Sequence, residues 1–469
     1  MKQHSIPRGS IMLLAIATIL ILSSLLLVFV REMRIEAQAA ANRAATLQAA
    51  GIARGAIAYC INHLTSNQDP IALDTEMQCE ANPVGDGYFW ILKPDVTDET
   101  KYAFGLTDEA SKLNLNTATY EMLKAMPNMS TDLSGSITDW RDSDDSVSNQ
   151  GGAESEYYLL LAEPYYCKNA PFETPEEILL VKGATTDLLY GVDANHNGVV
   201  DASEDDAKST LSISGFNGNA RCGIMKYLTV YSREVNTDAN GKPRTNIAQA
   251  SSTQITQLFS KIASPARLTA IQLRARANRG YRSVFEFYYK LGLTPDEFKK
   301  VVDKITVNPE KIIQGLVNIN TAPKEVLQCL PGMAEGDGDA LIARRTSSGT
   351  DLTNVAWVLD TLSAPKALTI SNYITAKSKR FSADIVAVSG DGRGFKRMRC
   401  VFDASGTVPK VLYCKDMSHL GWPLDPGILE DLRAGKAVTP GTQTSPLQQN
   451  SQKSNTSGSS SSSSFGGSR

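Results

Sequence analysis

Residues 10–30 read SIMLLAIATILILSSLLLVFV, and this uninterrupted apolar run sets the architecture of the 469-residue chain. At about 1.5 Å per residue the run forms a helix of roughly 30 Å, the thickness of the hydrocarbon core of a bilayer. Lys2 and Arg8 precede it. Because positive charge stays on the cytoplasmic side of a membrane helix, everything after Val30 is expected outside the cytoplasm.

A cleavable secretory signal is the alternative interpretation of this N-terminus, since residues 37–39, Ala-Gln-Ala, form a small-residue cleavage site. The apolar region of such signals is usually about 7–15 residues long, and here charged residues separate it from that site. The stretch from Arg31 to Leu64 is rich in alanine and contains no proline. One helix over residues 10–64 is therefore predicted, running from the membrane into solvent.

A Pro-Arg-Gly tripeptide at residues 7–9 stands directly before Ser10 and the apolar helix. This N-terminus resembles that of type IV pilins and type II secretion pseudopilins, in which a prepilin peptidase cuts after the glycine. The resemblance implies cleavage between Gly9 and Ser10. The chain departs from the usual pattern at the fifth position after that site, where most members have glutamate and this chain has Leu14. Among pseudopilins, the protein K family lacks this glutamate and is unusually large, as this chain is.

Five further segments resemble the protein K family and follow in that family's order. They are residues 139–145, 152–154, 157–158, 168–172 and 175–183, which read DWRDSDD, GAE, YY, KNAPF and PEEILLVKG. The resemblance implies a minor pseudopilin of a type II protein secretion system, with one pass through the bacterial inner membrane and its large C-terminal part in the periplasm. It also implies that the chain caps the pseudopilus tip, and helps to initiate it, with the I and J minor pseudopilins.

The expected fold class is α+β, with a pilin-like fold of a long N-terminal transmembrane helix and a small antiparallel sheet, interrupted by a large all-helical insertion. Three β-rich runs, residues 380–388, 395–403 and 410–417, are separated by turn residues and are expected to close the sheet. The predicted parts are a leader (1–9), the helix (10–64), the first part of the head (65–105), the inserted domain (106–378), the closing strands (379–436) and a disordered Ser/Gly-rich tail (437–469).

An internal repeat lies within the inserted domain, at residues 113–123 (LNLNTATYEML) and 317–327 (VNINTAPKEVL). The two copies are expected to form related helical hairpins, helix-hairpin-helix-like repeats, and each to begin a helix with Thr117 or Thr321 as its N-cap. The words NLNTA and NINTA also resemble the helix-hairpin-helix DNA-binding module of periplasmic competence proteins, which gives an alternative function. That function needs a basic, glycine-rich turn facing phosphate. Acidic residues at 335–339 and a net charge of −3 disfavour nucleic acid, so the repeats are interpreted as scaffold.

Residues 193–204, DANHNGVVDASE, match the twelve-residue EF-hand calcium loop at every ligand position. Gly198 permits the sharp turn. The predicted ligands are Asp193, Asn195, Asn197, Val199 (through its carbonyl), Asp201 and Glu204. An Asp/Asn/Gly-rich surface loop is the alternative. Affinity of about 10⁻⁴–10⁻³ M is expected, which makes calcium a structural cofactor.

A second metal site is a weaker possibility, because protein K relatives hold calcium in their helical domain and the loop at 193–204 looks like an addition to the family's core. Asp142, Asp144 and Glu154 are the candidate ligands. Their spacing matches no metal template, so a solvated acidic loop explains them equally well.

The seven cysteines show no CxxC spacing, which argues against a zinc or redox motif. Cys400 and Cys414 lie in two of the β-rich runs and are expected to face each other across a hairpin and form a disulfide. Cys60 with Cys79, and Cys167 with Cys222, are weaker guesses.

No enzyme motif is present. The four histidines are scattered, and no GxSxG, HExxH or P-loop pattern occurs. A binding and assembly role is therefore expected, and a plain membrane-anchored calcium-binding protein is the third hypothesis.

Overall fold

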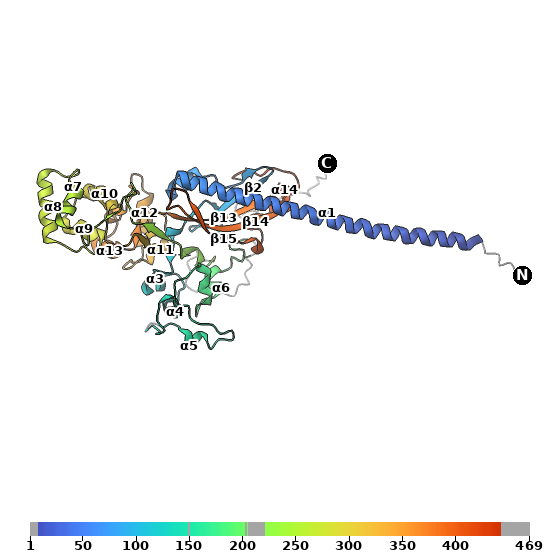
Figure 1. Cartoon of the computed structure of the whole chain (residues 1–469), viewed down its shortest axis with the longest axis horizontal. Coiled ribbons are helices and arrows are strands. Elements are labelled where there is room, and N and C mark those ends of the chain that lie inside the picture. Colours follow the sequence, from blue (N-terminus) through green and yellow to red (C-terminus); the bar gives the residue numbers. More distant parts are fainter. Residues whose placement is uncertain (1–7, 149–150, 202–203, 205–220, 442–469) are drawn as a thin grey trace, which may run out of the picture.

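A computed structural model describes residues 8–148, 151–201, 204 and 221–441 of the chain. Its first element is the long helix α1 (Arg8–Ser66), which projects far from the rest of the molecule (Figure 1). The side chains from Ile11 to Ala40 are exposed, and Ala45 is the first to be buried. The predicted continuous helix over 10–64 is confirmed. Residues 1–7 of the expected leader and most of the expected tail lie outside the described residues.

The buried half of α1 packs on an antiparallel sheet with the order β1-β2-β13-β14-β15. Ile52, Ala53 and Ala56 recur at helical spacing and meet apolar side chains of β2, β13 and β14. The five strands are β1 (Asn82–Val84), β2 (Gly87–Lys93), β13 (Arg380–Val388), β14 (Phe395–Asp403) and β15 (Lys410–Asp416). The three closing strands predicted from the sequence are confirmed.

The other face of the sheet has its own apolar core. Trp90, Val386 and Val388 pack there against the C-terminal segment, which contributes Leu424 and the helix α14 (Pro426–Arg433). Two short strands, β3 (Ala103–Phe104) and β4 (Thr107–Asp108), pair with β2 and β13. A short helix, α2 (Pro70–Glu76), follows α1. Helices thus cover both faces of the sheet.

The insertion occupies residues 109–379, not the predicted 106–378, because β4 still belongs to the sheet. The prediction that it is all-helical is wrong, since it also contains short paired strands. It contains three segments that each begin and end with two-residue strands paired in parallel, which we call the closed units. The first pairs β5 (Leu113–Asn114) with β6 (Leu228–Thr229), the second β8 (Thr245–Asn246) with β9 (Ile305–Thr306), and the third β11 (Val317–Asn318) with β12 (Ile374–Thr375). Between the units, β7 (Arg233–Val235) pairs with β10 (Ile312–Gln314).

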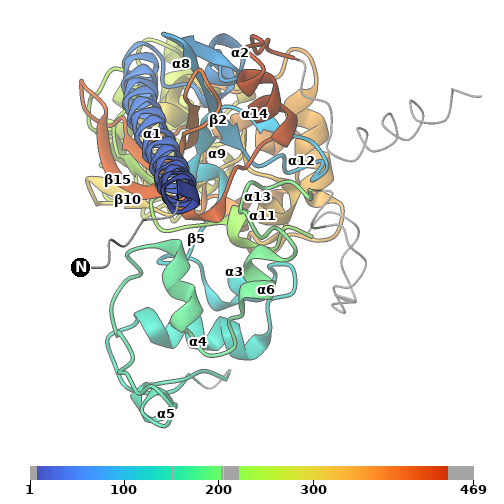
Figure 2. The same cartoon turned by 90° about the vertical axis from the view of Figure 1, so that its right-hand side faces the viewer.

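Short helices fill each closed unit. The first holds α3 (Tyr120–Lys124), α4 (Thr131–Arg141), α5 (Ser155–Tyr158) and α6 (Thr186–Tyr190). The second holds α7 (Ser252–Phe259), α8 (Pro265–Ala277), α9 (Val284–Leu291) and α10 (Pro295–Val301). The third holds α11 (Lys324–Gln328), α12 (Asp337–Thr346) and α13 (Ala364–Ile370). The first unit forms a lobe beside the sheet (Figure 2), and the second lies at the end farthest from the N-terminus (Figure 1).

One hydrogen-bond pattern recurs in all three closed units. An asparagine ends each opening strand, and its side-chain oxygen accepts the N–H two residues later, at 2.9, 3.0 and 3.1 Å for Asn114, Asn246 and Asn318. A threonine ends each closing strand and does the same, at 3.0, 3.0 and 3.1 Å for Thr229, Thr306 and Thr375. The repeat is therefore threefold where the sequence indicated two copies. A helix-hairpin-helix form of the repeats is not confirmed.

The predicted N-caps of the repeat helices are wrong. The turn after Asn114 extends to Ala118, whose N–H donates to the Asn114 carbonyl at 2.9 Å. The first helix therefore begins later, with Thr119 as its N-cap. In the third unit Pro323 precedes the helix, and the Thr321 hydroxyl instead donates to Asp108 at 2.6 Å.

Asp108, the last residue of β4, joins the sheet to the closed units. Its buried carboxylate accepts hydrogen bonds from the N–H of Ala110 at 2.8 Å and the side-chain amide of Asn318 at 2.8 Å. The hydroxyls of Thr321 and Ser378 also donate to it. Two donors from the third unit and one from each segment that links the insertion to the sheet thus converge on one carboxylate.

The expected disulfide between Cys400 and Cys414 is confirmed, and these residues face each other in the β14–β15 ladder. The two weaker guesses are wrong, because Cys60, Cys79, Cys167 and Cys222 are buried without a disulfide. Cys167 and Cys222 both lie within the first unit, but their environments differ. Cys167 lies 3.8 Å from the Asp139 carbonyl, whereas Cys222 lies near Glu99 and Asp193.

Candidate functional site

The membrane-facing part of α1 is the first functional element. Among the described residues, one helix is long and apolar enough to cross a membrane, Ile11–Ser66, with a mean hydropathy of 2.9 over its most apolar window. No part of that window is buried in the chain itself. Leu14 is 69% exposed. Such a surface is stable in lipid or against other apolar helices, since its burial from water is favourable.

The calcium-type loop at 193–204 is folded around its first residue. The carboxylate of Asp193 accepts the N–H groups of Asn197 at 3.0 Å and Gly198 at 2.8 Å. Gly198 has a φ of 81° and His196 a φ of 56°, which gives the loop its sharp turn. Ala202 and Ser203 lie outside the described residues.

The two ends of this loop meet, as a metal site requires. Glu204 accepts the N–H of Ala194 at 2.9 Å and that of Asp201 at 3.0 Å. Asp201 in turn accepts the side-chain amides of Asn195 at 2.6 Å and Asn197 at 3.2 Å. The five predicted side-chain ligands are therefore brought together.

The electrostatics of the loop suit a divalent cation. Burial raises the pKa of Asp193 to about 7, and the negative charge of Glu204 adds to the shift. Burial also raises the pKa values of Asp201 and Glu204. Partly buried carboxylates that repel one another are costly without a compensating charge. Three carboxylates and two amides are hard oxygen donors of the kind that calcium prefers, so the residues present fit that ion.

Asp142, Asp144 and Glu154 also converge. One carboxylate oxygen from each lies within 4.8 Å of the others. Glu154 is only 2% exposed, and no nitrogen or oxygen donor of the described residues reaches either of its oxygens. Burial raises its pKa to about 7, although the Cys167 thiol partly offsets this. A buried carboxylate that no nitrogen or oxygen donor of the described residues reaches indicates a cation site more strongly than the sequence did.

The end of α4 positions this cluster. The Arg141 guanidinium donates to the carbonyls of Leu115 and Ala118. Arg345 makes the matching contacts in the third unit, with the carbonyls of Ile319 at 3.1 Å and Ala322 at 2.7 Å. Asp142 follows the first arginine, whereas Thr346 follows the second. The acidic cluster is therefore an addition to a shared framework.

Several residues around the calcium-type loop were not recognised in the sequence. The Tyr102 hydroxyl donates to Asp201 at 3.1 Å. Arg397 and its hydrogen-bond partner Asp384 belong to the sheet, and Arg397 contacts the loop at the His196 carbonyl. A lone charged residue in the otherwise apolar strand FSADIVAV is the signal that could have found Asp384. The strand FKRMRCVF carries three basic residues, so its sequence does not single out Arg397. His196 is stacked on Tyr190 at 3.6 Å, and burial lowers its pKa to about 4, so it is a neutral packing residue.

The chain has an exposed apolar N-terminal helix, an antiparallel sheet and a large helical insertion. Together these define an α+β protein of the pilin type with a candidate membrane anchor. Two family models for protein K of the type II secretion system match this chain, one over residues 108–192 and the other over 317–376. The chain is a member of the protein K family and a minor pseudopilin of the type II secretion system.

The two matched ranges overlap the first and the third closed units. The second range, 317–376, coincides with the third unit, and the first contains the cluster of Asp142, Asp144 and Glu154 but ends before Asp193. The calcium-type loop thus lies outside the matched ranges.

Among solved structures, the chain is similar to one in the crystal structure of the GspK-GspI-GspJ complex of the type 2 secretion system from enterotoxigenic Escherichia coli. The TM-score is 0.38 and the sequence identity 13%, over 79% of this chain and 98% of that chain. Comparison with curated protein sequences gives no match.

Proposed function

We propose that this minor pseudopilin caps the pseudopilus at its tip and helps to initiate it, anchored in the inner membrane with its sheet and closed units in the periplasm. The shape of the head carries this proposal. The first unit spreads sideways from α1, and the second extends beyond its C-terminal end (Figures 1 and 2). A head of this width would clash with neighbours along a shaft of parallel helices, and a tip position avoids the clash.

Leu14 supports the same position. A glutamate at this place is costly in lipid unless it pairs with the terminal amine of a neighbouring subunit. Leucine needs no such partner, so the chain can enter a membrane assembly before any other subunit. We propose the I and J minor pseudopilins as the subunits that join it, and the prepilin peptidase as the enzyme that processes it. The solved complex named above contains GspK, GspI and GspJ. We assign no reaction to the chain, and DNA binding is not favoured.

Immunogold labelling of isolated pseudopili tests the tip position. Antibodies against the closed units should label one end of each filament, because one wide head fits there. Antibodies against the major pseudopilin should label the whole length and serve as the control. Gold particles distributed along the shaft with the first antibody would contradict a cap.

We further propose that calcium is a structural cofactor, bound by Asp193, Asn195, Asn197, Val199, Asp201 and Glu204. The carboxylates of Asp142, Asp144 and Glu154 are proposed as a second cation site. The support is the loop geometry in the first case. In the second it is the burial of Glu154, which no nitrogen or oxygen donor of the described residues reaches. When bound, calcium would supply positive charge to buried carboxylates. It would link the chain's folding to metal concentration.

Calcium is expected to stabilise the detergent-solubilised chain by about 2.7 kcal/mol per site when its concentration is a hundred times the dissociation constant. Thermal unfolding with and without calcium measures this effect. Glu204→Gln and Glu154→Gln should each remove part of the stabilisation, and magnesium should reproduce little of it because it demands a smaller octahedral site. An unfolding temperature that does not respond to calcium would argue against both sites.

A further inference from the structure

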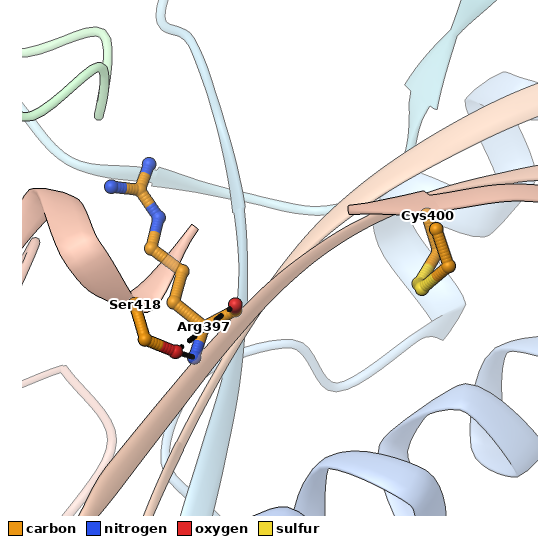
Figure 3. The surroundings of a disulfide bond; sticks show 4 residues. Arg397, Cys400 and Ser418 are labelled. Atoms are coloured by element: carbon orange, nitrogen blue, oxygen red, sulfur yellow. Dashed lines mark hydrogen bonds between the residues drawn. A yellow bond between two sulfur atoms is a disulfide. The ribbon is translucent and has the colours of Figure 1, made fainter. Parts of the chain in front are cut away.

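Arg397, in the middle of β14, is a fully buried charged residue, with 0% of its surface exposed. Figure 3 shows its guanidinium extending away from the Cys400 disulfide on the same strand. A buried guanidinium is stable only when its charge is paired and its N–H groups are hydrogen-bonded. Its hydrogen-bond partners therefore indicate the role of Arg397.

One set of partners belongs to the sheet. The Arg397 Nε–H donates to Asp384 at 2.9 Å and an Nη2–H donates to the same carboxylate at 2.7 Å, a bidentate pair between β14 and β13. Arg399 also donates to Asp384, at 3.0 Å. The two cations lower the pKa of Asp384 although burial opposes this, so the carboxylate is charged. The charge of Arg397 is thereby paired within the sheet, with a carboxylate that it shares with Arg399.

The other set of partners belongs to the calcium-type loop. Arg397 donates to the backbone carbonyls of Asn195 and, at 2.8 Å, His196. His196 has a positive φ, which a residue with a side chain rarely adopts without support. The loop lies more than 190 residues away in the sequence, so this contact joins the insertion to the sheet. Arg397 thus fixes the backbone at the third and fourth positions of the loop.

Two more segments meet at the same place. The Asn197 side-chain amide donates to the Pro423 carbonyl at 2.8 Å, and the Ser418 hydroxyl accepts the Arg397 backbone N–H at 3.0 Å (Figure 3). The N–H of Val200 donates to the Glu99 carbonyl at 2.8 Å. The loop therefore contacts β14, the segment after β2 and the C-terminal segment together.

We propose that Arg397 and Asp384 are positioning residues for calcium in the 193–204 loop. Bound calcium and the contact that Arg397 makes between sheet and insertion, which we call the joint, then stabilise each other. This inference rests on the calcium binding proposed above. Residues behind a ligand set hold its geometry, and their loss typically costs about 10–100-fold in metal affinity. Because coupling free energies are reciprocal, a joint that strengthens calcium binding is itself strengthened by calcium.

The test compares calcium affinity in the unaltered chain and in the double variant R397M/D384N, both as full-length protein in detergent. The double variant removes the buried pair together, because Arg397→Met alone would leave the buried Asp384 carboxylate with only Arg399 as a cationic partner and endanger folding. Isothermal titration measures the affinity, and the binding step that Glu204→Gln abolishes identifies the loop. We expect that step to weaken about 10–100-fold in the double variant.

A variant of the same strand is the matched control. C400S/C414S removes a disulfide of the sheet without touching the loop, so it should lower the unfolding temperature and leave calcium affinity unchanged. Hydrogen exchange supplies a second measurement. Calcium should slow exchange of the Met417 amide, which donates to the Arg397 carbonyl at 2.9 Å, in the unaltered chain and not in R397M/D384N.

Unchanged affinity of the loop in R397M/D384N would overturn the inference and leave the calcium proposal standing. Equal weakening in C400S/C414S would also overturn it, since affinity would then follow the general stability of the sheet. An unaltered chain with no titration step assigned to the loop would overturn both proposals.

Discussion

Replacing Gly9 with valine is expected to leave the entire population of the chain uncleaved, with residues 1–9 still attached. The resemblance of the N-terminus to prepilins implies a peptidase that cuts after glycine, and a branched side chain at that position would obstruct the bond to be cut. Processing should fall from complete to undetectable. Intact-mass spectrometry of protein extracted from the membrane of a host with a prepilin peptidase measures it.

Ser10→Ala is the matched control for processing, because it changes the neighbouring residue without adding bulk and should be cleaved as the unaltered chain is. The unaltered protein should begin at Ser10. A first residue at Met1, or one near Ala39, would contradict processing by a prepilin peptidase and favour retention of the leader or cleavage of an ordinary secretory signal. Secretion by the Gly9→Val strain should be lost, since assembly follows processing in the proposed function.

Replacing Asp108 with alanine is expected to destabilise the chain by about 3–5 kcal/mol, because several buried donors lose their acceptor at a cost of about 1–3 kcal/mol each. The substitution leaves the side chain of Asn318 and the hydroxyls of Thr321 and Ser378 without their common acceptor. Unsatisfied buried donors carry the full cost of their lost hydration. Urea unfolding followed by tryptophan fluorescence measures the change.

Asp351→Ala is the control for this effect. Asp351 also accepts several hydrogen bonds, from the N–H of Thr353 at 3.0 Å, from its hydroxyl, and from Asn354 at 3.1 Å, but it is exposed. Water replaces lost partners at the surface, so the expected cost is below about 1 kcal/mol. Similar costs for the two substitutions would show that Asp108 does not hold the sheet and the third unit together.

Local signals explain what the sequence could predict. The apolar run, the alternating strands and the hairpin that joins Cys400 to Cys414 depend on residues close in sequence, and all three are confirmed. The closed units depend on distant pairs, such as Leu113 with Leu228. The second unit was missed because its opening strand and the two residues after it read Thr-Asn-Ile-Ala, which keeps the asparagine and little else of the repeat.

The candidate site divides in the same way. The calcium-type ligands follow from the spacing of one twelve-residue loop, and the structure brings the side-chain ligands together. Arg397 and Asp384 could not be assigned to that loop from the sequence, since only the fold places β14 beside it. The convergence of Asp142, Asp144 and Glu154 likewise depends on the chain between them, which returns Glu154 to the end of α4.

The parallel closure of each unit separates the size of the head from the path of the main chain. The chain enters and leaves a unit at neighbouring residues, and the insertion as a whole does the same, since Asp108 of β4 pairs with Phe381 of β13. Residues added inside a unit would enlarge one side of the molecule and leave the distance between α1 and the sheet unaltered. Mass and connectivity are thus independent variables in this architecture, and the bulk of the head can change while the anchor and the sheet keep one fixed geometry.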